Sequence, residues 1–243
     1  MTAKLYSLLL SHPARASRLM LELKGVDHEA VDLVPGMHPV QLRAAGFRRG
    51  TVPALKLDGE RVQGSVPISR FLECLEPEPP LFPAQPEPRR AVEEAEAWGE
   101  RELQPVPRRI FRWGTVRSRE LRRWLAELSG IPAPGVAATL NAPIARRFAH
   151  LSEASDHGVR GDLSVLPAML DRVDGWIAEG TIGGAQLNAA DCQIASTVRV
   201  LLAYEDLRPM LEDRPSAALA TRLFPSYPGP IPLRLPEAWL PAR

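Results

Sequence analysis

Six prolines fall within twelve consecutive residues, PEPPLFPAQPEP, from Pro77 to Pro88. Proline has no backbone N–H and a fixed φ, so neither a helix interior nor a central strand accommodates this density. The segment therefore separates two parts of the chain. We interpret residues 78–88 as an extended, semi-stiff linker between domains at 1–77 and 89–243, with a polyproline II ligand segment as the alternative.

Strand and helix patterns alternate before the linker. Apolar runs and alternation indicate strands, and apolar residues spaced i, i+3, i+4, i+7 indicate helices. The expected order, β-α-β-α-β-β-α, gives a compact sheet with helices on its faces. The predicted strands lie at 5–10, 31–33 and in a hairpin at 51–65, and the predicted helical stripes at 16–23, 40–45 and 68–75, with Ser65 available as the N-cap of the last.

After the linker, the pattern is helical throughout and no hairpin signal is present, which predicts a helix bundle. The tetrad Asn188-Ala-Ala-Asp191 precedes an apolar helical run and has the form of a capping box. We therefore assign Asp191 a structural role, and expect its loss to lower stability before it alters any chemistry.

Composition narrows the class of protein. The 30 Lys and Arg residues balance 29 Asp and Glu residues, so no general attraction to nucleic acid is indicated. Cys74 and Cys192 are far apart, which argues against a disulfide framework, a structural zinc site and a dithiol redox centre, and the histidines show no metal-ligand spacing. The chain start lacks a signal-peptide core, and no apolar run approaches the ~18 residues of a membrane span. We expect a soluble cytoplasmic protein without a metal.

The hairpin start and two helix starts suggest a binding site for a small peptide. In an X-Pro bond the trans form is preferred over the cis form by only ~0.5–1 kcal/mol. A cis Val52-Pro53 bond would leave the backbone of Val52 unpaired at the sheet edge. Such an edge can bind an extended peptide by strand addition. Ser65 offers a hydroxyl and backbone N–H groups at a helix N-terminus, which suits a carboxylate. Ser11 opens the first helix in the sequence Ser11-His12-Pro13.

Four stretches together resemble the glutathione transferase superfamily: LYSLLLSHPARASRLMLELKGV from Leu5, VPAL from Val52, the helix start at Ser65, and LNAADCQIA from Leu187. The likeness spans nearly the whole chain. It implies a thioredoxin-like first domain with a mixed four-stranded sheet, a proline-containing linker and an all-helical second domain. The pattern S-x-P-x-R-A at Ser11 is most similar to theta-class members.

The resemblance implies an enzyme that transfers glutathione, or a related low-molecular-weight thiol, to a small electrophile. Glutathione would be a co-substrate, and no cofactor is implied. Ser11 would be the catalytic hydroxyl, donating a hydrogen bond to the sulfur and favouring its thiolate. By the same resemblance the backbone of Val52 would pair with the cysteinyl unit, and the glutathione-binding residues are His38, Val52, Pro53, Gly64 and Ser65.

The region after the linker lines the electrophile pocket in this family. Seven arginines lie between Arg108 and Arg123, and an acidic stretch precedes them, so we expect an internally paired helical surface rather than a nucleic-acid patch. An arginine-rich pocket would suit an anionic or polarised electrophile. The pocket candidates are His12, Trp98, Arg101, Phe111 and Trp113.

Two departures from the family pattern leave alternatives open. Gly64 stands where members commonly carry an acidic residue or Gln, so a partner for the γ-glutamyl ammonium is missing unless Gln63 substitutes in part. Ala14 replaces a cysteine or serine of several classes, which makes cysteine-type exchange chemistry improbable. The leading hypothesis is a detoxifying, homodimeric transferase; a noncatalytic interaction protein is second, and a nucleic-acid binder is third.

Overall fold

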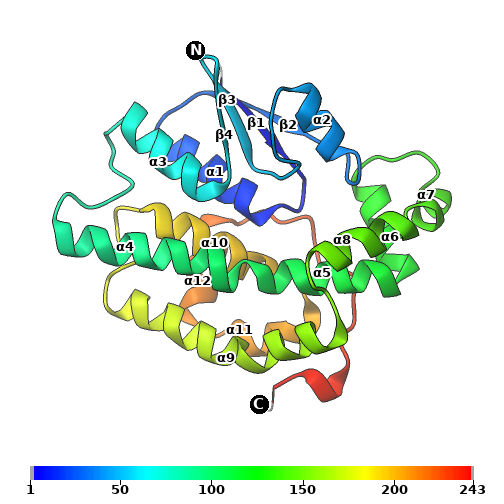
Figure 1. Ribbon diagram of the computed structural model, residues 1–243. Helices are drawn as coiled ribbons and strands as arrows, with labels where there is room; N and C mark the ends of the chain where they lie inside the picture. The colour runs from blue at the N-terminus through cyan, green and yellow to red at the C-terminus, as the bar shows by residue number, and fades with distance from the viewer. Residues whose placement is uncertain (1–2, 242–243) are drawn as a thin grey trace.

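The computed structural model describes residues 3–241; residues 1–2 and 242–243, which the domain ranges above include, lie outside it. The first domain is built on a mixed four-stranded sheet of order β2-β1-β3-β4 (Figure 1). Strand β1 is parallel to β2 and antiparallel to β3, which pairs with β4. The predicted sheet and its β-α-β-α-β-β-α order are confirmed. The strands are β1 Ala3–Ser7, β2 His28–Asp32, β3 Ala54–Leu57 and β4 Glu60–Gln63, and the helices α1 His12–Leu23, α2 His38–Ala44 and α3 Ser65–Leu75.

The first strand is shorter than the apolar run predicted. Strand β1 ends at Ser7, and the chain turns so that the Ser11 N–H donates to the carbonyl oxygen of Leu8 at 2.8 Å. Helix α1 then begins at His12 with Pro13 in its first turn, where the missing N–H of proline is harmless. This turn sets Ser11 at the N-cap of α1, just beyond the end of the strand.

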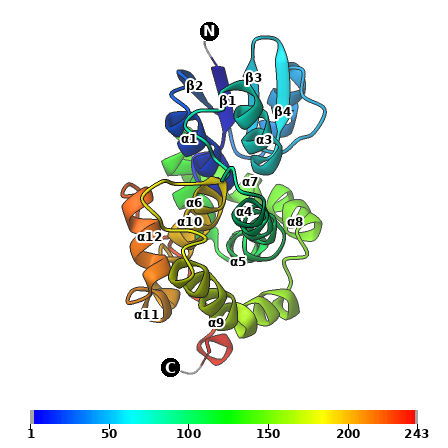
Figure 2. The same cartoon turned by 90° about the vertical axis from the view of Figure 1, so that its left-hand side faces the viewer.

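Helices cover both faces of the sheet (Figure 2). Helices α1 and α3 pack together on one face, where Met20, Ile68 and Leu72 are fully buried. Helix α2 covers the other face through a smaller apolar cluster that contains Leu42 and Phe47. The sheet is therefore a rigid support for the loops at its edges.

The second domain is helical, as predicted. Helices α4 Pro86–Trp98 and α5 Pro105–Arg117 run on from one another through a π-helical segment, Gly99–Leu103, and lie beneath the first domain in Figure 1. Within residues 3–241, no helix is both long and apolar enough to span a membrane. The remaining α-helices are α6 Arg119–Leu128, α7 Pro134–Leu140, α8 Ala142–Leu151, α9 Asp156–Ala178, α10 Ala189–Leu201, α11 Arg208–Leu211 and α12 Pro215–Leu223, with short 3-10 turns at Glu205–Leu207 and Glu237–Trp239.

Helix α10 is the central helix of the second domain, and its start has the predicted capping box. The Asn188 side chain accepts from the Asp191 N–H at 3.1 Å, and the Asp191 carboxylate accepts from the Asn188 N–H at 2.9 Å. Asp191 is fully buried and also accepts from the Gly183 N–H at 2.6 Å. These bonds join the loop before α10 to the helix, which is a structural role.

The proline segment is fixed to both domains. Helix α4 begins at Pro86, so the last three residues of the expected linker form its first turn. Leu81 is buried; its N–H donates to Glu73 in α3 at 2.8 Å, and its carbonyl accepts from Ala189 in α10 at 3.0 Å. One apolar core, with Leu81 in it, continues from the first domain into the second. The relative position of the two domains is therefore set by packing.

Candidate active site

Four loops meet at one edge of the sheet. The register pairs Ser7 with Asp32, Tyr6 with Ala54, and Ala54 with Gln63. One edge of the sheet, running across the strand ends, is therefore formed by the ends of β1, β2 and β4 and the start of β3. This edge faces the helical domain in Figure 1. The loops that follow carry the predicted glutathione-site residues.

The Val52-Pro53 peptide bond is cis, as the sequence predicted. Pro53 is buried, and its carbonyl oxygen accepts from the Gly64 N–H at 3.0 Å, which joins the start of β3 to the start of α3. The β3 ladder begins at Ala54, and the backbone of Val52 makes no hydrogen bond within the described residues. An unpaired N–H and C=O therefore lie at this edge, which is the arrangement that strand addition requires.

Ser11 can donate a hydrogen bond toward the same edge. Its half-exposed hydroxyl accepts from the Ala14 N–H at 3.3 Å as the N-cap of α1. A serine hydroxyl has one proton to donate in addition to its acceptor lone pairs, so capping leaves the proton free for a ligand. The positive end of the α1 dipole favours an anion at this position.

Ser65 is the first residue of α3 and not its N-cap, so that prediction is wrong. The N-cap is Gly64, whose φ of 102° lies in the left-handed region that favours glycine. The Ser65 side chain is 1% exposed, and its hydroxyl has no hydrogen-bond partner in the described part of the chain. A buried hydroxyl without a partner is unusual, and a bound ligand would satisfy it.

His38 lies between the two domains. It begins α2, is 5% exposed, and its ring stacks on Phe148 of α8 with centroids 5.4 Å apart. Burial, and then the charge of Arg112, lower its pKa to about 4. Its buried Nδ1 has no partner within residues 3–241. His38 is therefore neutral at pH 7 and retains a ring nitrogen for a ligand.

His12 is an interdomain contact rather than a wall of an open pocket, which corrects its expected role. Its ring is 6% exposed, and Nε2 lies 3.3 Å from the Gln104 carbonyl oxygen, so we place the proton on Nε2. Burial, and then the charge of Arg108, lower the pKa of His12 to about 3. A neutral His12 cannot serve as an acid near neutral pH, and it fixes α1 against the second domain.

Protonation of His12 should destabilise the protein in acid. The folded-state pKa of about 3 lies below the ordinary 6.5, so the unfolded chain takes up this proton first as pH falls. The contribution is complete above about pH 6.5 and is lost below it, which predicts a loss of about 2 kcal/mol of unfolding free energy between about pH 7 and about pH 5. Denaturant titrations of wild type and His12→Gln at both pH values measure it.

The difference between the two proteins isolates His12. Burial raises the pKa of Glu96 to about 7, partly opposed by Arg70 and Ser69, so this group shifts stability in the opposite direction over the same pH range. Both proteins keep Glu96, and only the wild type should lose the additional 2 kcal/mol or so. Parallel pH profiles for the two proteins would contradict the neutral, buried His12.

Two tryptophans predicted to line the electrophile pocket point away from the first domain. Trp98 packs edge-on against Trp176 of α9 at 5.1 Å. Trp113 donates from Nε1 to Asp156 at 2.7 Å and packs on Trp239. Both side chains are buried in the core cluster, and their place in an electrophile pocket stays a prediction.

The remaining two pocket candidates, Arg101 and Phe111, differ in their exposure to solvent. Arg101 is exposed on the π-helical segment between α4 and α5. Phe111 is half-buried on α5 and packs against the main core. Within residues 3–241, no hydrogen bond, ion pair or ring contact joins the side chain of either residue to the sheet-edge loops, and their place in a pocket stays a prediction.

Gln63 cannot substitute for the missing acidic side chain at position 64. Its amide group donates to the carbonyl oxygens of Arg49 and Thr51, at 2.8 and 3.2 Å, and accepts from the Arg49 N–H at 3.0 Å. Both ends of the amide are therefore used to hold the loop before Pro53. The Gln63 side chain therefore holds the loop in place and is not available to bind the γ-glutamyl ammonium of glutathione.

Within residues 3–241, the glutamates of residues 93–102 form no ion pair with the arginines of residues 108–123, contrary to expectation. Glu93 pairs with Arg89, and Glu96 pairs with Arg70 of α3.

The sequence did not identify two residues, Arg112 and Phe148, which reach the site from α5 and α8. Only the tertiary fold brings α8 beneath α2, so no local pattern could have identified Phe148.

Residues 5–80 match the family model described as the glutathione S-transferase N-terminal domain. The whole chain aligns with a glutathione S-transferase from Rhodospirillum rubrum at 23% identity, over 98% of this chain and 97% of the other, with a TM-score of 0.60. The chain has the glutathione S-transferase fold.

Further relatives agree with the glutathione S-transferase fold. A glutathione S-transferase from Methylobacterium radiotolerans, solved in complex with glutathione sulfonate, aligns at 21% identity over 97% of each chain with a TM-score of 0.55. A beta-etherase, LigF, from Sphingobium aligns at 19% identity over 91% of this chain and 99% of the other, with a TM-score of 0.62.

One curated relative is more similar but over a shorter stretch. The maleylacetoacetate isomerase of Mus musculus is 34% identical over 99 residues, which are 36% of this chain and 43% of that protein. The match thus spans less than half of the relative. Theta-class affinity is not supported by these comparisons and stays a prediction.

No group of three or more His, Cys, Asp or Glu side chains is placed to hold a metal ion among residues 3–241. Cys192 is buried, and burial raises its thiol pKa well above the ordinary value. The second cysteine, Cys74, is exposed on α3.

Proposed function

We propose that this protein is a glutathione S-transferase that binds glutathione, or a related low-molecular-weight thiol, and transfers it to a small electrophile. The observation that carries the proposal is the meeting of Ser11, the unpaired Val52 backbone and the unpartnered Ser65 hydroxyl at one sheet edge, within a domain that matches the family model.

Each group has a role that its surroundings support. The extended tripeptide would pair with the backbone of Val52 beside Pro53, and its γ-glutamyl carboxylate would accept from the Ser65 hydroxyl and the N–H groups that open α3. His38 would donate from its free ring nitrogen to the glycyl carboxylate. Gly64 would contribute backbone only.

Ser11 would activate the thiol without acting as a base. A free thiol has a pKa of about 8.5, so most of it is protonated near neutral pH. A hydrogen bond from the Ser11 hydroxyl and the α1 dipole would favour the thiolate, and a two-unit shift requires about 2.7 kcal/mol of differential stabilisation. The thiolate then attacks the electrophilic carbon, and the leaving group departs with its electron pair.

A thiol-dependent isomerase is a second catalytic candidate, because the curated relative is named an isomerase. A thiolate that adds to a conjugated double bond and later leaves allows rotation about that bond, with no net transfer. The same Ser11-activated thiolate would serve both reactions, and the product distinguishes them.

A noncatalytic binding protein is the third candidate, and one observation favours it. Gly64 has no side chain, and both ends of the Gln63 amide are engaged, so the γ-glutamyl ammonium has no evident partner in the described first domain. Weak or absent thiol binding would follow.

We also propose, from the family alone, that the protein is a cytoplasmic homodimer that assembles through α3 and the first helices after the linker, with detoxification as its role. Analytical ultracentrifugation tests the dimer: twice the chain mass of 26.7 kDa supports it, and a monomer at micromolar concentration contradicts it.

Calorimetric binding of glutathione, followed by a turnover assay with 1-chloro-2,4-dinitrobenzene, tests the proposed function. We expect binding in the micromolar to millimolar range, weakened by Ser65→Ala, and thiol-dependent turnover above the uncatalysed rate. Glu127→Gln, an exposed substitution on α6, is the control and should leave both unchanged. Binding without turnover favours the noncatalytic candidate, and no binding of any thiol tested overturns the proposal.

A further inference from the structure

The seven arginines between Arg108 and Arg123 fall into two groups. Five have side chains engaged within the second domain, whereas the guanidinium groups of Arg108 and Arg112 make no ion pair and no hydrogen bond with the chain from residue 3 to residue 241. The engaged residues are Arg109 with Asp162, Arg117 with Asp156, Arg123 with Glu127, and Arg119 and Arg122 with backbone carbonyls of α5, α7 and nearby residues.

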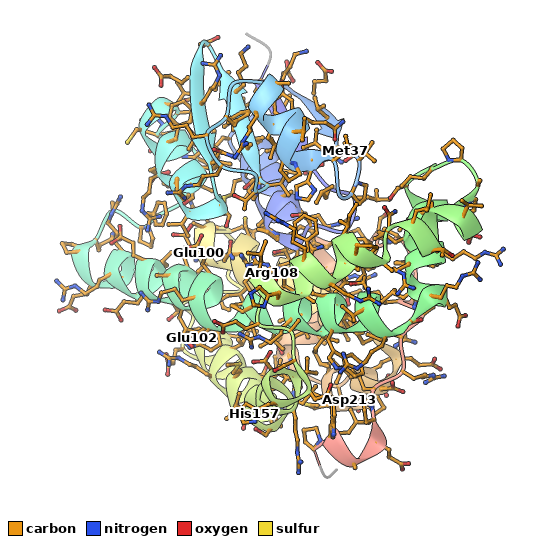
Figure 3. All side chains as sticks on the ribbon, turned by 45° about the vertical axis from the view of Figure 1, so that its right-hand side comes forward. Met37, Glu100, Glu102, Arg108, His157 and Asp213 are labelled. Carbon is orange, nitrogen blue, oxygen red and sulfur yellow. The ribbon has the colours of Figure 1, made fainter. Side chains whose placement is uncertain are left out.

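The two unpaired arginines lie on the same face of α5. They are four residues apart, which places their side chains one above the other on a helix. This face is directed toward the first domain: Arg108 acts on the charge state of His12 in α1, and Arg112 acts on that of His38 in α2. Figure 3 labels Arg108 and Glu100 on the side of the α4–α5 helix next to the first domain, and Glu102 on the other side.

The surroundings fix Arg112 more firmly than Arg108. The Arg112 guanidinium lies over the Phe148 ring at 4.5 Å, and the same ring also stacks on His38. Arg112 and Phe148 also line a cavity of about 50 Å³ with Gly36 and Ile144. Stacking on an aromatic ring holds the guanidinium plane and leaves its N–H edge available for a planar anion.

The pair carries positive charge that the protein does not neutralise. Burial, and then the nearby charge of Arg108, lower the pKa of Arg112 to about 10. Glu100 is the carboxylate whose charge acts on Arg108, but it makes no ion pair with it. Neither guanidinium group forms an ion pair with a carboxylate of residues 3–241, so an anion that binds there would meet positive charge that no acidic side chain already holds.

We propose that Arg108 and Arg112 bind a carboxylate group of the electrophile, so that the protein selects anionic electrophiles. This inference rests on the proposed function, because it assigns a substrate class to the same site. A carboxylate can accept N–H bonds from a guanidinium in a bidentate geometry, and a neutral ester of the same shape loses the charge-assisted part.

The position of Arg108 favours the electrophile over glutathione as the source of the carboxylate. His12, whose pKa the charge of Arg108 helps to lower, directly follows Ser11, the residue proposed to hold the sulfur. An anion bound at Arg108 would therefore lie on the second-domain side of the reacting sulfur. The glycyl carboxylate of glutathione is the other source of the same chemistry, near His38 and Arg112, and it must be tested separately.

The test compares two electrophiles with one reacting centre, 4-chloro-3,5-dinitrobenzoate and its methyl ester. In both, the glutathione thiolate forms a C–S bond at the ring carbon and chloride leaves with the C–Cl electron pair. We expect kcat/KM, corrected for the uncatalysed rate, to be about tenfold or more higher for the carboxylate in wild type. Arg112→Gln and Arg108→Gln should each bring the ratio of the carboxylate kcat/KM to the ester kcat/KM close to one, and Arg123→Gln on the exposed face of α6 should keep the preference.

Binding measurements separate this inference from the proposed function. Calorimetry with 3,5-dinitrobenzoate, which cannot react, should show binding in wild type and in Arg123→Gln and a loss of about tenfold or more in Arg108→Gln. Turnover of both electrophiles without a preference overturns the inference and leaves the transferase proposal intact. No turnover, with dinitrobenzoate binding lost in the variants, overturns the transferase proposal and supports the anion site.

A last arm identifies which carboxylate is bound. If Arg112→Gln weakens glutathione binding about tenfold but leaves binding of its glycyl monoethyl ester and of dinitrobenzoate unchanged, the pair binds the glycyl end and the inference is wrong. If glutathione and its ester are affected equally and dinitrobenzoate binding is lost, the electrophile is the source. The Arg108→Gln variant guards against misfolding of Arg112→Gln, because Arg108 is exposed and its side chain makes no hydrogen bond or ion pair within residues 3–241.

Discussion

Replacing Ser11 by alanine should raise the apparent pKa of the glutathione-dependent reaction from about 6.5 toward the free value of about 8.5, because the thiolate loses the one side-chain hydrogen bond proposed for it and keeps only the α1 dipole. Near pH 7 the ionised fraction of the thiol would fall from about three quarters toward about 3%, which predicts a loss of up to about twentyfold in rate. The pH dependence of kcat/KM for the electrophile, measured with saturating glutathione, gives both numbers.

The shape of the profile distinguishes this role from a structural one. Ser11 also caps α1, so Ser11→Ala should lower the free energy of unfolding by about 1 kcal/mol. Ser11→Asp keeps a capping acceptor but has no proton to donate when ionised, and should share the kinetic defect without the full loss of stability. A Ser11→Ala enzyme with an unshifted pH profile would remove Ser11 from the chemistry.

The largest expected effect on stability comes from Glu73. Its carboxylate lies 2.6 Å from the ammonium of Lys24, whose side chain is 0% exposed, and it also accepts from the Leu81 N–H. Glu73→Ala would leave a buried ammonium with carbonyl partners only and a backbone N–H with none. Breaking a buried pair in this way costs about 3–5 kcal/mol, and chemical denaturation measures it.

An exposed ion pair on α1, the helix that Lys24 directly follows, is the control. Glu22 pairs with Arg18 in α1, and both side chains are about half exposed to solvent. Glu22→Ala should therefore change the unfolding free energy by no more than about 0.5 kcal/mol. Equal effects of Glu73→Ala and Glu22→Ala on the unfolding free energy would show that the Lys24–Glu73 ion pair and the Leu81 N–H bond to Glu73 do not stabilise the protein as expected.

Local patterns predicted the elements of this fold well, and their ends less well. Apolar spacing located α1 and α3, and turn residues located the β3–β4 hairpin. The run at Leu8 to Leu10 was included in the first strand, because apolar composition alone does not show where the ladder stops. Residue type predicts Ser65 as the N-cap, whereas the positive φ that ends the hairpin falls on Gly64.

The first-domain part of the site was predictable, and the second-domain part was not. Ser11, Pro53 and Ser65 each follow or precede a strand end, so the sheet register brings their loops together. Trp98 and Trp113 were assigned to the pocket by region and residue type. Which face of α4 and α5 meets the first domain depends on packing against α9, and this tertiary contact directs both rings away.

The most direct test of the account is a titration of the thiol of glutathione bound to the wild-type protein, followed by the ultraviolet absorbance of the thiolate. We predict a midpoint about two pH units below the value of about 8.5 for the free thiol. A midpoint equal to that of the free thiol would contradict a site that holds this peptide as its thiolate.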